Sequence, residues 1–182
     1  MRLPGYFILA VLALTGLTGC EHVGVFEPFR EVECIQRARI SITEAIAVAQ
    51  ADGGKVLEAD YRQDDEMGCL RGNPGQYDIT LLQDGRIAAL SVDAESGRAG
   101  PRSDQNVMNA LLRAGNRFEG SPADMARMMP DMEIGMSQAI GTAQKDGGIA
   151  LSAWIEAKDG EPGYTVKVVE NGRVRVTWVA GT

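Results

Sequence analysis

The chain carries two copies of one short sequence pattern, and this repeat restricts its possible folds more than any other feature. The first copy is ISITEAIAVAQADGG at Ile40–Gly54, and the second is IGMSQAIGTAQKDGG at Ile134–Gly148. A pair of alternating apolar segments follows each copy, at Gln76–Val92 and at Gly163–Val179. Self-similarity of this kind indicates one supersecondary unit that is used twice. The sequence therefore predicts two related structural units.

Each copy has the features of a short helix with a marked beginning and end. In the first copy, Ser41 or Thr43 can cap the helix N-terminus, and Asp52–Gly54 can end it because glycine readily adopts the left-handed conformation. The apolar residues of both copies recur at helical spacing, so each helix is expected to bury one face. They are Ile42, Ala45, Ile46 and Ala49 in the first copy and Met136, Ala139, Ile140 and Ala143 in the second.

Three strands are predicted after each helix. Lys55–Arg62 and its counterpart Ile149–Glu156 alternate in the manner of half-buried strands. The segments that follow contain Asp84–Gly85 and Asn171–Gly172, which are strong signals for two-residue hairpin turns. A hairpin alone is marginally stable in water, so each helix must cover one face of its sheet. The predicted class is α+β, with two αβββ units that each pack one helix on a three-stranded antiparallel sheet.

This order of elements and these residues resemble the PepSY family. The family motif has an Ile/Ala helix that ends in Gly-Gly, then a Tyr-led strand, an Asp-Gly turn and a strand that ends in Val-Asp. The matching segments here are Ile42–Gly54, Tyr77–Gly85 and Val92–Asp93. The second copy departs from the motif, because Ala180 follows its last valine and the trailing aspartate turn is missing.

The resemblance implies an organisation and a function. It covers most of residues 40–98 and, more loosely, residues 134–179. It implies PepSY-like units at 40–98 and 134–182, joined by a partly helical linker at 99–133. Such units occur in propeptides of thermolysin-like proteases and in tethered bacterial proteins, and the family is associated with binding and restraining peptidases. The implied function is non-catalytic binding of an envelope protein or peptidase, although a fold alone does not fix function.

The N-terminal residues have the features of a bacterial lipoprotein signal. A basic residue, an apolar run and small residues precede Cys20, and Leu17–Cys20 resembles a lipobox. This implies a signal peptide at 1–19, a diacylglycerol on the Cys20 thiol and a tether at 20–39, so the lipid would hold the protein to the membrane. Glu21 follows the cysteine instead of aspartate, which favours the outer membrane facing the periplasm. The alternative is an ordinary signal peptide with an incidental cysteine.

Composition argues against several classes of function. A net charge of −7 disfavours nucleic acid and anionic lipid headgroups as partners. His22 is the only histidine and lies next to the expected anchor, so neither a serine–histidine–aspartate arrangement nor a zinc site of several histidines is expected. The acidic run Asp64–Glu66 could act as an acid/base pair but is more typical of a solvated loop. We expect no enzymatic activity and no cofactor.

Two further cysteines would lie in an oxidising compartment, where a disulfide can persist. Cys34 precedes the first predicted helix, and Cys69 lies in a loop that the second copy lacks. A Cys34–Cys69 bond would fasten that loop to the helix start. The alternative is a pair of free thiols that are buried as small hydrophobic groups.

The second hairpin predicts an apolar surface. A two-residue turn at Asn171–Gly172 places residue 169 opposite 174 and residue 165 opposite 178. On the sheet face away from the helix, this gathers Trp154, Val169, Val174, Val176 and Trp178. The first copy has polar residues at the corresponding positions, including Asp60, Thr80 and Ser91. The surface could dock a partner, since tryptophan is frequent at binding hot spots, or another part of the chain could cover it.

The segment between the copies is expected to be partly helical and is rich in methionine. Ser103–Asp104 can cap a helix through about Arg113, and Ser121–Pro122 can start a second helix that Pro130 stops. Thioethers suit Cu(I), but methionine is also an ordinary filler of cores. A soft-metal protein and a purely structural envelope lipoprotein therefore stay as alternatives to a partner-binding protein. The methionines are Met125, Met128, Met129, Met132 and Met136.

Overall fold

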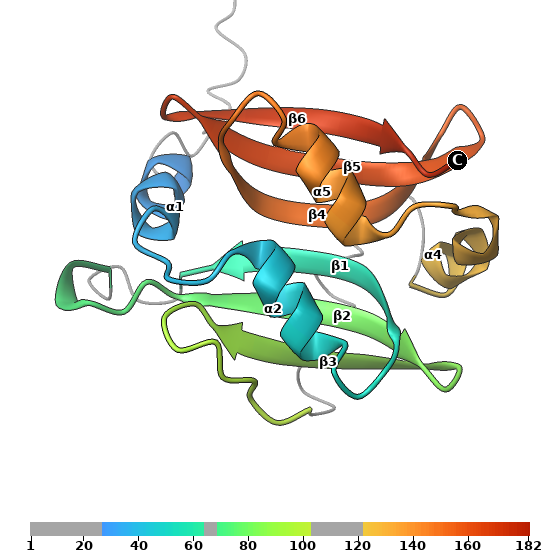
Figure 1. Cartoon of the computed structure of the whole chain (residues 1–182), viewed down its shortest axis with the longest axis horizontal. Coiled ribbons are helices and arrows are strands. Elements are labelled where there is room, and N and C mark those ends of the chain that lie inside the picture. Colours follow the sequence, from blue (N-terminus) through green and yellow to red (C-terminus); the bar gives the residue numbers. More distant parts are fainter. Residues whose placement is uncertain (1–26, 64–68, 103–121) are drawn as a thin grey trace, which may run out of the picture.

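The computed structural model describes residues 27–63, 69–102 and 122–182, which form one antiparallel sheet with helices α2 and α5 on one of its faces (Figure 1). The six strands lie in the order β3-β2-β1-β4-β5-β6. The α+β class predicted from the sequence is therefore confirmed. The strands are β1 Lys55–Arg62, β2 Gln76–Gln83, β3 Arg86–Asp93, β4 Ile149–Lys158, β5 Glu161–Glu170 and β6 Arg173–Ala180.

Four α-helices lie within the described residues, and two of them cover the sheet. Helices α2 and α5 lie side by side on it and bury the two predicted apolar stripes (Figure 1). None of the helices in the described ranges is long and apolar enough to cross a membrane. The helices are α1 Glu27–Ile35, α2 Ile42–Ala49, α4 Pro122–Met128 and α5 Met136–Ala143, with short 3-10 helices η1 Cys69–Arg71 and η2 Met129–Asp131.

The two expected three-stranded sheets are joined into one, which is the main departure from the sequence-based prediction. β1 and β4 pair at the centre of the sheet through Glu58 with Trp154, Ala59 with Ala153 and Asp60 with Ser152. A separate sheet would leave both of these strands as open edges, and their pairing removes two edges at once. One hydrophobic core runs under both helices as a result. We refer to residues 27–102 as the first half and to residues 122–182 as the second half.

The start of α2 follows the predicted capping chemistry. The Ser41 hydroxyl accepts a hydrogen bond from the Glu44 N–H at 3.3 Å, and the Glu44 carboxylate accepts one from the Ser41 N–H at 2.6 Å. This capping box satisfies two N–H groups that the helix leaves free, and the bonds from Ser41 lower the pKa of Glu44. Helix α5 begins at Gly135, which has no side chain to cap it.

All three hairpins of the sheet turn through two residues with positive φ. The predicted turns at Asp84–Gly85 and Asn171–Gly172 have φ values of 50° and 73°, and 51° and 73°. A third turn, which was not predicted, joins β4 to β5 at Asp159–Gly160 with φ values of 54° and 85°. Its Asp-Gly sequence is the same signal as in the other turns and lengthens β4 by two residues beyond the expected Glu156.

Part of the segment expected as a tether at 20–39 is helix α1. Val32 and Ile35 of this helix are buried in the core, so the tether prediction was wrong for these residues. Cys34 of α1 is bonded to Cys69 of η1, with a Cα–Cα distance of 5.4 Å that is ordinary for a disulfide. This is the pairing expected from the sequence, and it fastens the loop between β1 and β2 to the N-terminal helix.

Two buried tyrosines hold the chain just before each covering helix. The Tyr77 hydroxyl donates to the Ile40 carbonyl at 2.8 Å, and the Tyr164 hydroxyl donates to the Ile134 carbonyl at 2.9 Å. Burial raises the pKa of both phenols. Each tyrosine therefore stays protonated and fixes the position of one helix over the sheet.

Of the linker predicted at 99–133, the structure describes residues 99–102 and 122–133. Helix α4 starts at Pro122 and passes into η2, which contains Pro130, as the sequence predicts. Helix α4 packs against β1 and β4, the two central strands. The helix expected at Ser103–Arg113 lies outside the described residues. So do Cys20, His22 and the acidic run Asp64–Glu66.

Candidate functional site

The residues predicted to form an apolar surface lie on the sheet face opposite α2 and α5, in the predicted register. Thr165 of β5 pairs with Trp178 of β6, and Val169 pairs with Val174. On the other side of β5, Thr165 pairs with Trp154 of β4. A row that crosses three strands therefore carries Trp154, Thr165 and Trp178.

The structure divides this predicted surface into a buried part and an exposed part. Trp154 and Val169 are 8% and 3% exposed, so they do not offer a free surface. Val174 and Val176 are 41% and 58% exposed, and Trp178 is half-buried. Of the five predicted residues, only the three on β6 are thus accessible. Sequence alternation assigned all five residues to one face but could not tell which of them is covered.

Two lysines lie over the tryptophan rings. The Lys158 Nζ is 5.9 Å from the ring centroid of Trp178, and the Lys167 Nζ is 5.8 Å from that of Trp154. Ammonium groups at this distance are attracted to the negative face of the indole. The exposed end of β4 and the outer strand β6 therefore combine apolar and cationic groups.

A shallow hollow lies beside Trp178 on the same face. It has a volume of ≈ 380 Å³, and its lining residues come from β4, β5 and β6. The Thr165 hydroxyl donates to the Glu156 carboxylate, so the acidic wall of the hollow is fixed. The hollow offers an acceptor, an ammonium donor and an apolar wall, which are groups that can bind a side chain of a protein. Its lining is Glu156, Ala157, Lys158, Thr165, Val176 and Trp178.

The position of Trp178 depends on Gly163, a residue that the sequence analysis did not single out. A Cβ atom at Gly163 would lie 2.7 Å from Cε2 and from Cζ2 of the Trp178 indole. The indole therefore lies against the bare backbone of β5. The corresponding position of the first half is Gln76, and Ser91 stands there in place of Trp178.

The outer edges of the sheet, β3 and β6, differ in how far they are covered. Residues that follow β3 fold back onto it: the Gly100 N–H donates to the Ser91 carbonyl at 2.7 Å, and Val92 forms a bridge with Ala99. Among the described residues, no segment pairs with the outer edge of β6. Within the described part of the chain, the backbone groups along that edge therefore have no strand partner, and such an edge can accept an added strand.

An aspartate sets the fold-back at β3. The Asp93 carboxylate accepts bonds from the Ser96 N–H and hydroxyl, both at 2.6 Å, and from the Glu95 N–H at 3.2 Å. The side-chain and backbone bonds from Ser96 lower the pKa of Asp93. This turn directs residues 98–100 back to β3, and the Asp93 N–H donates to the Arg98 carbonyl at 3.0 Å. Ala180 stands at the corresponding place in β6 and has no such acceptor.

The first half carries buried carboxylates on the same face, where the second half carries tryptophans. Glu58, Asp60 and Asp78 are 2%, 8% and 7% exposed. The Asp78 carboxylate accepts from the Arg62 guanidinium at 3.0 Å and from the Ser91 hydroxyl at 2.6 Å. The predicted contrast between the halves is thus present, and the polar side chains of the first half are buried. The described residues contain no cluster of histidine, cysteine, aspartate and glutamate that could hold a metal ion.

The five methionines near the start of the second half pack against the core to different degrees. Met125, Met129 and Met136 are buried, and Met128 and Met132 are partly buried against the core. Three of them, Met129, Met132 and Met136, line one cavity of ≈ 330 Å³. Core filling therefore accounts for Met125, whereas Met129, Met132 and Met136 also line this cavity.

Comparisons with protein-family models, with curated proteins and with solved structures gave no match for this chain. The PepSY resemblance therefore stays a prediction from the residues.

Proposed function

We propose that this chain is a lipid-anchored envelope protein built from two PepSY-like αβββ units, and that it works by binding a protein. The partner class implied by the resemblance is a peptidase, which the bound protein would restrain. The lipid on Cys20 would hold the protein to the outer membrane on its periplasmic side.

Several matched contacts support two related units. The Ala94 carbonyl accepts bonds from the Arg39 and Ile40 N–H groups at 2.9 and 3.3 Å. In the second half, the Gly181 carbonyl accepts from the N–H groups of Glu133 and Ile134 at 2.7 and 3.1 Å. The tyrosine bonds to residues 40 and 134 repeat in the same way. Such repeated contacts are the expected result of one unit used twice.

The open outer edge of β6 is the observation that carries the proposed binding. An extended segment of a partner can add to this edge as a seventh strand, because the backbone groups of β6 supply its hydrogen bonds. Its side chains would then lie beside Val174 and Val176, whose burial favours association. The hollow at Trp178 would take a neighbouring side chain and add selectivity. Binding in this manner blocks a peptidase by occupying space, with no bond made or broken.

A site-specific cross-linking experiment tests this proposal. A photo-reactive amino acid replaces Val176 in the full chain expressed in its host, and a matched chain carries it at Val48, an exposed valine of α2 that is 36% exposed. We expect Val176 to give one cross-linked protein that Val48 does not give, and we expect mass spectrometry to identify a peptidase. Addition of the purified chain should then lower the activity of that peptidase.

A charged variant completes the test. Val176→Lys should abolish the inhibition while leaving the free energy of unfolding within about 0.5 kcal/mol, because the side chain is exposed. Val48→Lys is the matched control and should inhibit as the parent chain does. Equal cross-linking from Val48 and Val176, or full inhibition by Val176→Lys, would refute binding at the β6 edge.

A further inference from the structure

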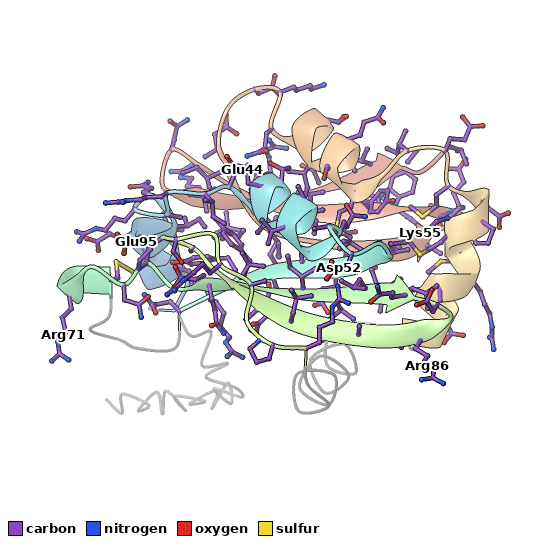
Figure 2. All side chains as sticks on the ribbon, turned by 60° about the horizontal axis from the view of Figure 1, so that its bottom comes forward. Glu44, Asp52, Lys55, Arg71, Arg86 and Glu95 are labelled. Carbon is purple, nitrogen blue, oxygen red and sulfur yellow. A yellow bond between two sulfur atoms is a disulfide. The ribbon has the colours of Figure 1, made fainter. Side chains whose placement is uncertain are left out.

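The cavity lined by three methionines lies where α2, α5 and the start of β1 meet. Met129 belongs to η2, Met132 follows it, and Met136 is the first residue of α5. Met129 and Met136 are 9% and 4% exposed, and Met132 is half-buried. Figure 2 shows sulfur atoms beside the labelled Lys55, which lines the same cavity. Three methionines that are close in sequence therefore line one partly open cavity.

The backbone that carries these methionines is held at several points. The Met132 N–H donates to the Met129 carbonyl at 3.2 Å, and the Ile134 carbonyl accepts the Tyr164 hydroxyl at 2.9 Å. Met132 also packs on Gly181, where a Cβ atom would lie 2.9 Å from its Cε methyl. The backbone that carries the methionines is thus held by the fold before any ligand arrives, which lowers the entropic cost of binding.

We propose that Met129, Met132 and Met136 form a binding site for one Cu(I) ion. Thioether sulfur is a soft ligand that selects Cu(I) over hard cations such as Mg²⁺ and Ca²⁺. Ile46 and Val56 form an apolar part of the wall beside the polar Gln50, and the cavity volume of ≈ 330 Å³ leaves room for one ion.

Two charged residues of the lining adjust the affinity in opposite directions. The Glu133 carboxylate offsets the charge of the ion, and the Lys55 ammonium opposes it. Thioethers carry no proton to displace, so binding should vary little with pH between about 5 and 8, unlike a histidine or thiolate site. This site lies on the helix side of the sheet and is independent of the proposed β6 edge.

Competition for Cu(I) against a coloured chelator tests the site on the mature full chain in detergent. Ascorbate keeps the copper reduced and leaves the Cys34–Cys69 disulfide intact, and a thiol titration of the same sample verifies that no free cysteine competes. We expect one Cu(I) per chain. Met132→Leu should weaken binding by at least about tenfold, since one of three ligands is lost and a tenfold change corresponds to a modest free energy.

Two variants make the result specific. Met125→Leu is the matched control, because Met125 is buried in the same segment and does not line the cavity, and it should bind as the parent chain does. Lys55→Gln should bind more tightly because a like charge is removed. A parent chain that takes up no Cu(I), or a Met125→Leu chain that loses as much affinity as Met132→Leu, would overturn the proposal.

A second measurement uses the parent chain, so it does not require any variant to fold. Ag(I) is a redox-stable ion of the same soft class, and it can be added to the parent chain labelled with ¹³C on the methionine methyl groups. The methyl resonances of Met129, Met132 and Met136 should shift together at one equivalent, while that of Met125 stays in place. Shifts spread evenly over all methionines, or none at all, would contradict the site.

Discussion

The two outer strands of the sheet end alike and then differ, and the difference shows how one carboxylate closes an edge. Both strands run into a carbonyl, of Ala94 and of Gly181, that accepts two N–H groups from the segment before the covering helix. Asp93, the last residue of β3, organises a turn that brings residues 98–100 back onto β3, whereas Ala180 at the end of β6 cannot. Native sheets blunt their edges because open ones add strands from other chains. A β6 edge left open is therefore more informative about function than the covered β3 edge.

The first half is also locked covalently, and the second half is not, so removing the lock should give the largest effect. The bond between Cys34 and Cys69 spans a sequence separation of 35 residues. Cys34→Ala/Cys69→Ala should lower the free energy of unfolding by about 3–4 kcal/mol through loop entropy of the unfolded chain. Urea unfolding measures the loss, and hydrogen exchange should show it in α1 and η1 before α5. A loss below about 1 kcal/mol would remove the contrast between the halves.

The next largest effect on stability is expected at Gly163, against which the Trp178 indole packs. Gly163→Ala would put a Cβ atom 2.6 Å from the Val179 carbonyl oxygen as well as against Trp178. The strand or the indole must shift, at a cost of about 1–3 kcal/mol. The variant makes this position of the second half more like the first, where Gln76 stands. Tryptophan fluorescence should move to longer wavelength, and an unchanged spectrum with unchanged stability would show that Trp178 does not depend on Gly163.

Opening the β3 edge sharpens the comparison directly. Asp93→Ala removes three hydrogen bonds at a partly solvated turn, and it should cost about 1 kcal/mol. Hydrogen exchange of the Gly100 N–H should become faster, because residues 98–100 lose their support. Retained protection of that N–H would show that the edge is closed by something other than the aspartate.

The Asp93 turn should make the stability of the β3 edge depend on pH, and β6 has no matching carboxylate. The folded-state pKa of Asp93 lies below its ordinary value of 3.8, so the aspartate binds a proton more readily in the unfolded chain. Its contribution to stability is complete above that ordinary value and is lost as pH falls through the lowered folded pKa. Asp93→Asn keeps an acceptor but cannot ionise. In this variant, the protection of the Gly100 N–H against hydrogen exchange should therefore change less as the pH falls through the acidic range.

The smallest effect compares the two covering helices. Helix α5 has Gly141 where α2 has Ala47, and a Cβ atom at Gly141 would meet nothing within 4 Å. Gly141→Ala should raise the free energy of unfolding by about 0.5–1 kcal/mol, because glycine loses more backbone entropy in a helix. Thermal unfolding measures the gain. A loss of stability would mean that α5 needs the flexibility that α2 does not.

Local signals in the sequence predicted local structure well. Ser41 was found as a cap, β1 has the expected bounds, and the register of Thr165 with Trp178 follows from the turn. Turn chemistry and capping act over a few residues, so one sequence contains them. The Asp159–Gly160 turn carried the same signal and could have been predicted.

Contacts between distant segments could not be predicted in this way. The pairing of Glu58 with Trp154 joins strands that are far apart in the chain, and no local pattern encodes it. For the same reason alternation placed Val169 on the candidate surface without revealing its burial. Helix α1 was missed because it follows an apparent export signal and was assigned to the tether. The methionine cavity likewise depends on how η2 sits against α2, which only the fold reveals.

The central seam between β1 and β4 has a mechanical consequence. Only three residue pairs join these strands, whereas every other pair of neighbouring strands is matched over most of its length. A pulling force or mild denaturant would part the sheet there first, and each half would keep its own hairpins. Two chains whose halves exchanged partners across this seam would form a swapped dimer.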